Sequence, residues 1–322
     1  MKLSIVVPLY NEVESVLELH EELTQSTLNF EGEREVIYVN DGSNDGTQDC
    51  LDSLARSCPF VKVIEFTRNR GKSAAYMAGF AAVEGDIVIT MDGDLQDDPA
   101  EIPNLLAALA QGNDLVIGWK QGRMENEPLK KIPSAVFNSL VSASFGLTIH
   151  DSNCGMRAMR TVVAESLVLY GDLYRFIPEL AHMRGFRVTE APIAHRKRKY
   201  SYSKYGARRF WTGALDLLTV RFLTKYREKP LHFFGTLGMV PVVLGVGLEV
   251  YVLVQKLSGS LFQNHVAAII IGVMLILLGA QLLATGLIGE MLSSQLHHLR
   301  QTSSADGNRS EGKPAEKRAR FP

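Results

Sequence analysis

Residues 86–101 read DIVITMDGDLQDDPAE, an apolar run that ends in a turn crowded with acidic side chains. Five of the ten residues from Asp92 to Glu101 are Asp or Glu. Carboxylates packed this closely repel one another unless water, a cation or protonation relieves them. The β-branched run predicts a buried strand, and the acidic turn at its end predicts a place where something is bound.

The same alternation of short apolar runs and periodic stretches fills the first half of the chain. The apolar runs predict strands at residues 3–9, 35–40, 61–66, 86–91 and 114–118. The periodic segments predict helices at residues 12–27, 47–57, 71–85 and 99–112. Continuous apolar strands joined by helical crossovers indicate an α/β fold with a doubly wound, mostly parallel sheet. Ligands bind beyond the carboxyl ends of such strands, which is where the acidic turn falls.

The overall charge of the chain argues against nucleic acid as a partner. The chain has 322 residues and a formal net charge of −1, so no global field favours nucleic acid. Charge is nevertheless segregated, because residues 195–209 hold seven Lys or Arg and no acid. The three cysteines, Cys50, Cys58 and Cys154, are too few and too scattered for a disulfide framework. We therefore expect residues 1–209 to form a cytosolic domain with reduced thiols.

Two long apolar segments follow residue 230. Residues 231–255 contain one acid, Glu249, and no Lys or Arg, and residues 266–289 contain no charge. A segment of about 20 apolar residues crosses the hydrocarbon core of a bilayer. Residues 231–290 are therefore expected to form a transmembrane hairpin in the cell membrane.

The segments on either side of the hairpin set its orientation. Cations precede the first apolar segment and follow the second, which predicts that residues 1–209 and both chain ends lie in the cytoplasm. Residues 210–230 show apolar side chains at helical spacing and predict an amphipathic juxtamembrane segment at the membrane surface. The polar composition of residues 291–322 predicts a largely disordered cytoplasmic tail.

The Asp-x-Asp pair of the acidic turn suggests a metal. Carboxylate and carbonyl oxygens suit a hard divalent cation that shares its remaining positions with water and phosphate. Asp92, Asp94 and Gln96 are therefore candidate ligands of Mg²⁺ or Mn²⁺. The alternative is a solvated turn that caps the next helix, because Asp98 before Pro99 has the pattern of an N-cap. The position at a strand end favours the metal.

Two further turns are expected at the same edge of the sheet. In VNDGSNDGT, residues 39–47, Asp41 follows a strand and suits either a nucleoside contact or an ordinary turn. TRNRGKSAA, residues 67–75, is not a P-loop because Phe66 stands where the first glycine is required. Lys72 at a helix start still suits phosphate contacts. No G-x-G-x-x-G follows the first strand, which argues against a dinucleotide-binding oxidoreductase.

Six motifs, in this order, carry a family resemblance. They are IVVPLYNE (5–12), VNDGSNDGT (39–47), RNRGKSAAYMAGF (68–80), MDGDLQDDPAEIP (91–103), NCGMRAMR (153–160) and SYSKYG (201–206). Together they resemble the family 2 glycosyltransferases, which have a GT-A fold. More narrowly they resemble the polyprenyl-phosphate branch, which includes dolichyl-phosphate mannose synthase and the bacterial undecaprenyl-phosphate glucosyl and aminoarabinosyl transferases. The resemblance covers about residues 3–290.

The resemblance implies a membrane-bound, metal-dependent hexosyltransferase. Its donor would be a nucleoside-diphosphate sugar, and its acceptor undecaprenyl or dolichyl phosphate in the lipid bilayer. The implied donor-nucleotide residues are Pro8, Tyr10, Glu12, Asp41, Lys72 and Asp92. The implied metal ligands are Asp92, Asp94 and Gln96. The implied ligands of the acceptor phosphate, or of the donor's diphosphate, are Arg157, Arg198 and Lys204. The resemblance also allows a homo-oligomer.

The chemistry of a phosphate acceptor fits this allocation. The second pKa of a phosphomonoester is near 6, so the nucleophile is ionised at neutral pH and a strong general base is dispensable. The protein must instead stop two anionic groups from repelling each other. Asp94 and Arg157 are then the expected catalytic residues. Asp151 either orients Arg157, acts as a base or forms a purely structural pair with it. Direct in-line displacement would invert the anomeric centre.

Other classes of protein are disfavoured by particular features. A processive polysaccharide synthase would carry Q-x-x-R-W and more membrane spans, whereas RRFW at residues 208–211 lacks the glutamine. A non-catalytic membrane scaffold with a relic GT-A domain would have no need of the intact Asp-x-Asp, Asp41 and SKY motifs. A soluble nucleotidyltransferase would not need two apolar spans. No motif names the sugar, the nucleotide base or the polyprenyl chain.

Overall fold

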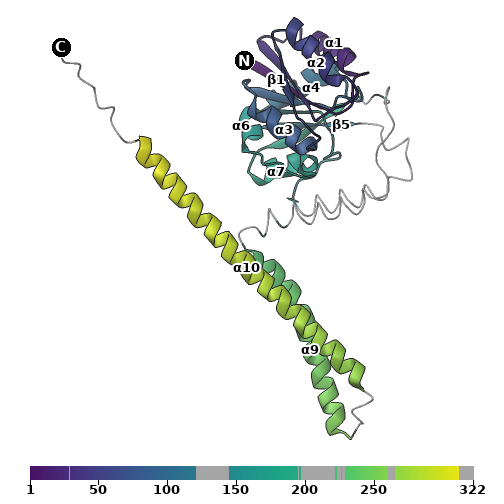
Figure 1. Cartoon of the computed structure of the whole chain (residues 1–322), viewed down its shortest axis with the longest axis vertical. Helices are drawn as coiled ribbons and strands as arrows, with labels where there is room; N and C mark the ends of the chain where they lie inside the picture. The colour runs from purple at the N-terminus through teal and green to yellow at the C-terminus, as the bar shows by residue number, and fades with distance from the viewer. Residues whose placement is uncertain are drawn as a thin grey trace, which may run out of the picture. The chain divides into compact units, whose positions relative to one another are not determined.

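The computed structural model describes residues 1–28, 30–120, 145–194, 196, 222, 226, 229–259 and 265–311, with side chains to residue 295 in the last helix. The chain divides into two compact units, Met1–Val220 and Arg221–Pro322. The first is an α/β unit, and the second contains two long helices (Figure 1). The expected ligands Arg198 and Lys204, and most of residues 210–230, lie outside the described residues.

A seven-stranded sheet in the order β3-β2-β1-β4-β6-β5-β7 forms the centre of the first unit. Its strands are β1 (Lys2–Leu9), β2 (Glu33–Asn40), β3 (Val61–Glu65), β4 (Ile87–Thr90), β5 (Leu115–Lys120), β6 (Arg157–Arg160) and β7 (Val188–Ile193). Every pairing is parallel except those of β6, which runs antiparallel to β4 and β5. The predicted α/β fold with a mostly parallel sheet is confirmed, and β6 is a strand that the sequence did not reveal.

The central strand shows why the sequence pattern predicted this fold. Residues 3–7 of β1 are all buried although their side chains alternate between the two faces of the sheet. Both faces of β1 are therefore covered, as the continuous apolar run requires. The helices described in this unit are α1 (Val16–Ser26), α2 (Thr47–Ser57), α3 (Lys72–Ala81), η1 (Pro99–Glu101), α4 (Ile102–Ala110), α6 (Thr161–Ser166), η2 (Leu173–Phe176) and α7 (Ile177–Met183), and α3 packs against β1.

The loops after β1 and β2 are tied together at the carboxyl edge of the sheet. The backbone N–H of Asn11 donates to Oγ of Ser43 at 2.9 Å, and the N–H of Asn44 donates to Oδ1 of Asn11 at 3.0 Å. Asn11 has a φ of 56°, in the left-handed region that asparagine tolerates better than most residues. Asn11 thus ties the loop after β1 to the loop after β2.

The second unit contains the two helices of the expected hairpin, α9 (Pro230–Leu257) and α10 (Val266–Glu311). Both are long and apolar enough to cross a membrane. They pack closely at glycines, since a Cβ on Gly279 would lie 2.4 Å from the carbonyl oxygen of Gly238. Helix α10 continues to Glu311, so residues 291–311 are helical where composition predicted a disordered tail. That stretch contains no proline that would end the helix.

Candidate active site

The acidic turn after β4 has a regular pattern of exposure. Its odd-numbered residues from Met91 to Pro99 are buried, whereas Asp92, Asp94 and Gln96 are partly exposed. Leu95 has a φ of 60°, a conformation that is strained for a side chain of this kind. The turn therefore presents the three expected metal ligands from alternate positions, and the backbone N–H of Gln96 donates to Oδ1 of Asp94 at 3.2 Å.

The end of the same turn is a helix cap. Oδ1 of Asp98 accepts a hydrogen bond from the N–H of Ala100 at 2.9 Å, and Pro99 occupies the first helical position. The guanidinium of Arg196 bridges Asp98 and Glu22, at 2.8 Å and 2.7 Å. The N-cap that the sequence suggested at Asp98 is thus confirmed, and it coexists with the accessible carboxylates rather than replacing them.

Asp92 is paired with Lys72. The Nζ atom of Lys72 lies 2.5 Å from Oδ1 of Asp92 and 5.8 Å and 5.2 Å from the ring centroids of Tyr76 and Tyr174. Burial opposes ionisation of Asp92, but the Lys72 ammonium holds the pKa of this carboxyl below its usual range. A Cβ on Gly155 would lie 2.4 Å from Oδ1 of Asp92, so the backbone of Gly155 packs directly against the carboxylate.

A further ion pair at the site, Lys120 with Asp97, is buried and was not predicted from the sequence. The Nζ atom of Lys120, at the end of β5, lies 2.6 Å from Oδ1 of Asp97, and the side chains are only 8% and 1% exposed. Lys120 also helps to keep Asp92 ionised. The predicted strand stopped at residue 118, two positions short of Lys120. Extending it would have placed a cation at the carboxyl edge of the sheet.

Arg157 is fully buried at the start of β6. Its Nη2 atom donates to the carbonyl oxygen of Tyr174 at 3.4 Å, and its Nε and Nη1 atoms have no partner among the described residues. No ion pair joins it to Asp151 within the described part of the chain, so the expected orienting contact is not formed here. Arg157 nevertheless contributes to the field that keeps Asp92 ionised. The structure thus brings Arg157 to the Asp-x-Asp turn.

Four of the expected nucleotide residues lie near the ends of β1 and β2: Pro8 is in β1, Tyr10 and Glu12 follow it, and Asp41 follows β2. Both carboxylate oxygens of Asp41 accept backbone N–H groups, from Arg70 at 2.6 Å and from Gly71 at 3.0 Å. Asp41 therefore fixes the loop that leads into α3. Oε2 of Glu12 accepts a hydrogen bond from Ser15 at 3.1 Å. Pro8 is partly exposed and Tyr10 is 38% exposed, so both are accessible at this edge.

The donor set fits a metal that is shared with a substrate. The described residues include no group of three or more His, Cys, Asp or Glu side chains that could hold an ion by themselves. Asp92, Asp94 and Gln96 instead offer oxygens from the accessible side of one turn. Such a set fits Mg²⁺ or Mn²⁺ completed by water and phosphate oxygens.

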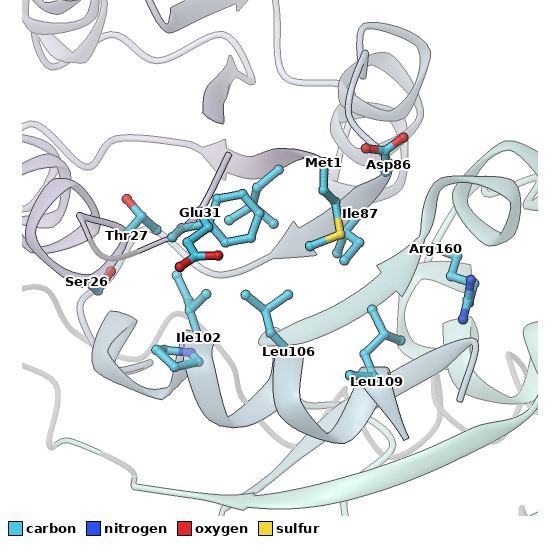
Figure 2. Close-up of a pocket in the computed structure, with 14 residues that line it drawn as sticks. Met1, Ser26, Thr27, Glu31, Asp86, Ile87, Ile102, Leu106, Leu109 and Arg160 are labelled. Atoms are coloured by element: carbon cyan, nitrogen blue, oxygen red, sulfur yellow. The ribbon is translucent and has the colours of Figure 1, made fainter. Parts of the chain in front are cut away.

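A separate groove lies at the other end of the strands. It has a volume of about 490 Å³ and is lined by Met1, Ile87, Ile102, Leu106 and Leu109 among others (Figure 2). Met1 and Ile87 mark the amino ends of β1 and β4, whereas the acidic turn follows the carboxyl end of β4. The groove is therefore not part of the candidate site.

Comparison with known proteins identifies the class. Residues 4–168 match the family model described as Glycosyl transferase family 2. The chain belongs to the family 2 glycosyltransferases, as its motifs predicted.

Two curated relatives show the branch of that family. The chain is 34% identical over 304 residues to the dodecaprenyl-phosphate galacturonate synthase of Rhizobium johnstonii, with 91% of this chain and 88% of the relative covered. It is 33% identical over 300 residues to the undecaprenyl-phosphate 4-deoxy-4-formamido-L-arabinose transferase of Pseudomonas fluorescens, with 92% and 86% covered. These relatives confirm the predicted polyprenyl-phosphate branch.

A solved structure supports the fold. The crystal structure of glucosyl-3-phosphoglycerate synthase from Mycobacterium tuberculosis in complex with Mn²⁺ and UDP-glucose is similar to this chain with a TM-score of 0.53. The match covers 68% of this chain and 78% of that one at 18% identity. At this identity the likeness shows a shared fold, and it agrees with the predicted GT-A architecture.

Proposed function

We propose that this protein transfers a sugar from a nucleoside-diphosphate sugar to a polyprenyl phosphate at the membrane surface. The observation that carries the proposal is the cluster at the carboxyl edge of the sheet. There the accessible carboxylates of Asp92 and Asp94 lie beside the half-buried cation Lys72 and the buried cation Lys120. The names of both relatives pair a polyprenyl phosphate with a sugar, and each alignment covers about nine-tenths of this chain.

The donor's diphosphate would bind at the acidic turn. A divalent cation, Mg²⁺ or Mn²⁺, held by Asp92, Asp94 and Gln96 would neutralise the charge of the leaving diphosphate. The ammonium groups of Lys72 and Lys120 add fixed positive charge beside the same turn. Pro8, Tyr10 and Glu12 would border the base and ribose. Asp41 would serve the nucleotide by fixing the backbone of Arg70 and Gly71.

The acceptor phosphate would be received by cations. Arg157 has two unpartnered guanidinium nitrogens among the described residues, and Arg198 and Lys204 would supply the rest. Because the phosphate is already ionised at neutral pH, Asp151 is not required as a base. Attack on the anomeric carbon opposite the diphosphate then inverts its configuration. A product with retained configuration, measured by NMR of the anomeric proton, would exclude this direct displacement.

The hairpin gives the reaction its location. Moving a polyprenyl chain from the bilayer into water costs a free energy of about 0.8 kcal/mol for each CH₂ group. The chain therefore stays in the bilayer, and its phosphate stays at the membrane surface. The first unit must meet it there, with both ends of the α9–α10 hairpin in the cytoplasm. The basic run 195–209 would add about 1 kcal/mol per cation of attraction to anionic headgroups. A homo-oligomer remains a prediction.

The test uses the full chain in lipid nanodiscs with polyprenyl phosphate, Mn²⁺ or Mg²⁺, and a panel of radiolabelled sugar nucleotides. We expect lipid-extractable label from one donor or a few, and its loss when EDTA removes the metal. Asp94→Asn should lower the initial rate by about 100-fold or more. Asp49→Asn, an exposed acid of α2, is the matched control and should leave it unchanged. Absence of label from every donor, or full activity of Asp94→Asn, would refute the proposal.

A further inference from the structure

The chain at the end of β7 is fastened to the start of α4 and to η1. The side-chain amide of Asn104 donates to the carbonyl oxygen of Pro192 at 2.8 Å. Two residues further on, the backbone N–H of Ala194 donates to Oε1 of Glu101 at 3.0 Å. These contacts lead the chain along η1 to the acidic turn, which it reaches at Arg196.

Arg196 contacts the acidic turn at two positions. Its backbone N–H donates to the carbonyl oxygen of Gln96 at 3.1 Å. Its guanidinium meets both carboxylate oxygens of Asp98, with Nε 3.1 Å from Oδ2 and Nη2 2.8 Å from Oδ1. Its Nη1 atom donates to both oxygens of Glu22 in α1, at 2.8 Å and 2.7 Å. One residue thus ties the second half of the turn to α1.

The backbone of the turn needs such support. Leu95 has a φ of 60°, and it stands between Asp94 and Gln96, two of the expected metal ligands. A side chain with a positive φ is strained, and the conformation persists only where the surrounding structure fixes it. If this residue relaxed, the oxygens on its two sides would no longer point to one cation. The contact of Arg196 with Gln96 lies directly after the strained residue.

Two other contacts hold different parts of the turn. The hydroxyl of Ser15 donates to the carbonyl oxygen of Gly93 at 2.7 Å, and Lys120 pairs with Asp97. Neither of these contacts reaches Gln96, whose carbonyl oxygen accepts from the backbone N–H of Arg196.

The ion pairs of Arg196 are only partly buried. The side chains of Arg196, Glu22 and Asp98 are 40%, 26% and 18% exposed. Ion pairs at this exposure contribute little to the stability of a fold. Their two-point contact with a strained, ligand-bearing turn points instead to control of local geometry.

We propose that Arg196 is a positioning residue for the metal site. It holds the turn from Gln96 to Asp98 so that Asp94 and Gln96 keep their oxygens directed to a shared Mg²⁺ or Mn²⁺. The inference rests on the metal-dependent transfer proposed above, and it adds a residue that the six sequence motifs do not include.

The first test measures the initial rate of transfer against Mn²⁺ concentration for the full chain in nanodiscs. Arg196→Gln should raise the half-saturating Mn²⁺ concentration by about ten-fold, as loss of a residue that orients metal ligands does. The rate at saturating Mn²⁺ should stay within a factor of about two of the wild type, because bound metal restores the turn. Arg196→Lys can meet one carboxylate at a time and should lie between the two. An unchanged Mn²⁺ dependence, or a loss of rate that saturating Mn²⁺ does not restore, would overturn the proposal.

The matched control is Arg187→Gln. Arg187 stands directly before β7, its side chain is 69% exposed, and its Nε atom lies 3.5 Å from Oδ2 of Asp114. It is thus an arginine paired with an aspartate at the opposite end of the same strand. Its replacement should leave the Mn²⁺ dependence unchanged.

The second test does not depend on transfer. Binding of Mn²⁺ is followed by the electron paramagnetic resonance signal of the free ion, with UDP and in parallel with GDP, and without acceptor. Asp98→Asn keeps a side chain that can cap the helix but removes the charge that Arg196 contacts. Arg196→Gln should weaken Mn²⁺ binding by about ten-fold, and adding Asp98→Asn should weaken it little further. Additive losses, or equal binding by the wild type and Arg196→Gln, would overturn the proposal.

Stability and transfer separate the possible failures. Arg196→Gln should lower Tm by no more than about 3 °C. A fall of about 10 °C or more would assign Arg196 to the stability of the fold and would overturn the positioning role. Absence of label from every donor would refute the proposed transfer, whereas Mn²⁺ binding would still decide the role of Arg196.

Discussion

The Nζ atom of Lys72 lies 2.5 Å from Oδ1 of Asp92, so the first carboxylate of the Asp-x-Asp pair carries its own counter-cation. Lys72 is also the first residue of α3, where the exposed backbone N–H groups and the helix dipole favour anions. An ammonium in this position is suited to neutralise Asp92 in the free protein and the diphosphate of a bound donor.

Replacing this ammonium tests its part in the reaction. Lys72→Met should lower the rate of sugar transfer by about 100-fold, because one preorganised cation is lost beside the developing charge of the leaving group. Lys72→Arg keeps the charge and should retain more of the rate. The measurement is the initial rate of lipid-extractable label at saturating Mn²⁺. A Lys72→Met rate within a factor of about two of the wild type would contradict the assignment.

Gly155 offers a test of the position of Asp92. A methyl group on residue 155 would come within 2.4 Å of Oδ1 of Asp92, so Gly155→Ala must displace the carboxylate or the strand behind it. We expect a higher apparent KM for Mn²⁺ and a lower rate, while circular dichroism still reports the α/β fold. Gly247→Ala, at a glycine with no atom within 4 Å of the added Cβ, is the control. Equal Mn²⁺ dependence in both variants would show that the turn tolerates the methyl group.

The parallel part of the sheet could be predicted because parallel strands that are buried on both faces have continuous apolar sequences. It predicted the accessible carboxylates because the Asp-x-Asp turn directly follows one of those runs. Strand β6 was not predicted because it has only four residues, two of them arginines, and because it pairs with strands far from it in the sequence. Composition and periodicity do not record such pairing.

The buried ion pair at the site was not predicted either, because its two residues are distant in the sequence. Lys120 and Asp97 look like ordinary polar residues in the sequence, and only the fold brings them to 2.6 Å. Charges of this kind become recognisable only when the three-dimensional structure shows that water is excluded from them.

The Lys120–Asp97 pair should show the behaviour of a buried ion pair. Asp97→Asn leaves Lys120 unpaired, and Lys120→Met leaves Asp97 unpaired, with burial raising the pKa of that carboxyl. Each single change should lower the free energy of unfolding by about 3–5 kcal/mol. The double variant should recover much of this loss because no unpaired charge remains. The measurement is Tm of the full chain in nanodiscs, and a double variant as unstable as the sum of the singles would exclude a mutual pairing.

The packing of the hairpin depends on glycines that allow α9 and α10 to approach. Apolar helices gain little from the hydrophobic effect inside a lipid bilayer, so close contact at small residues must hold them together. A Cβ on Gly279 would lie 2.4 Å from both the carbonyl oxygen of Gly238 and Cγ2 of Val242, whereas one on Gly247 would meet nothing within 4 Å. Gly279→Leu should therefore separate the helices, lower Tm in nanodiscs and expose the connecting segment to protease. Gly247→Leu adds the same apolar volume to the hairpin without that clash and should behave like the wild type. If the two variants unfolded and were cleaved alike, the hairpin would have to be held by something other than its glycine contacts.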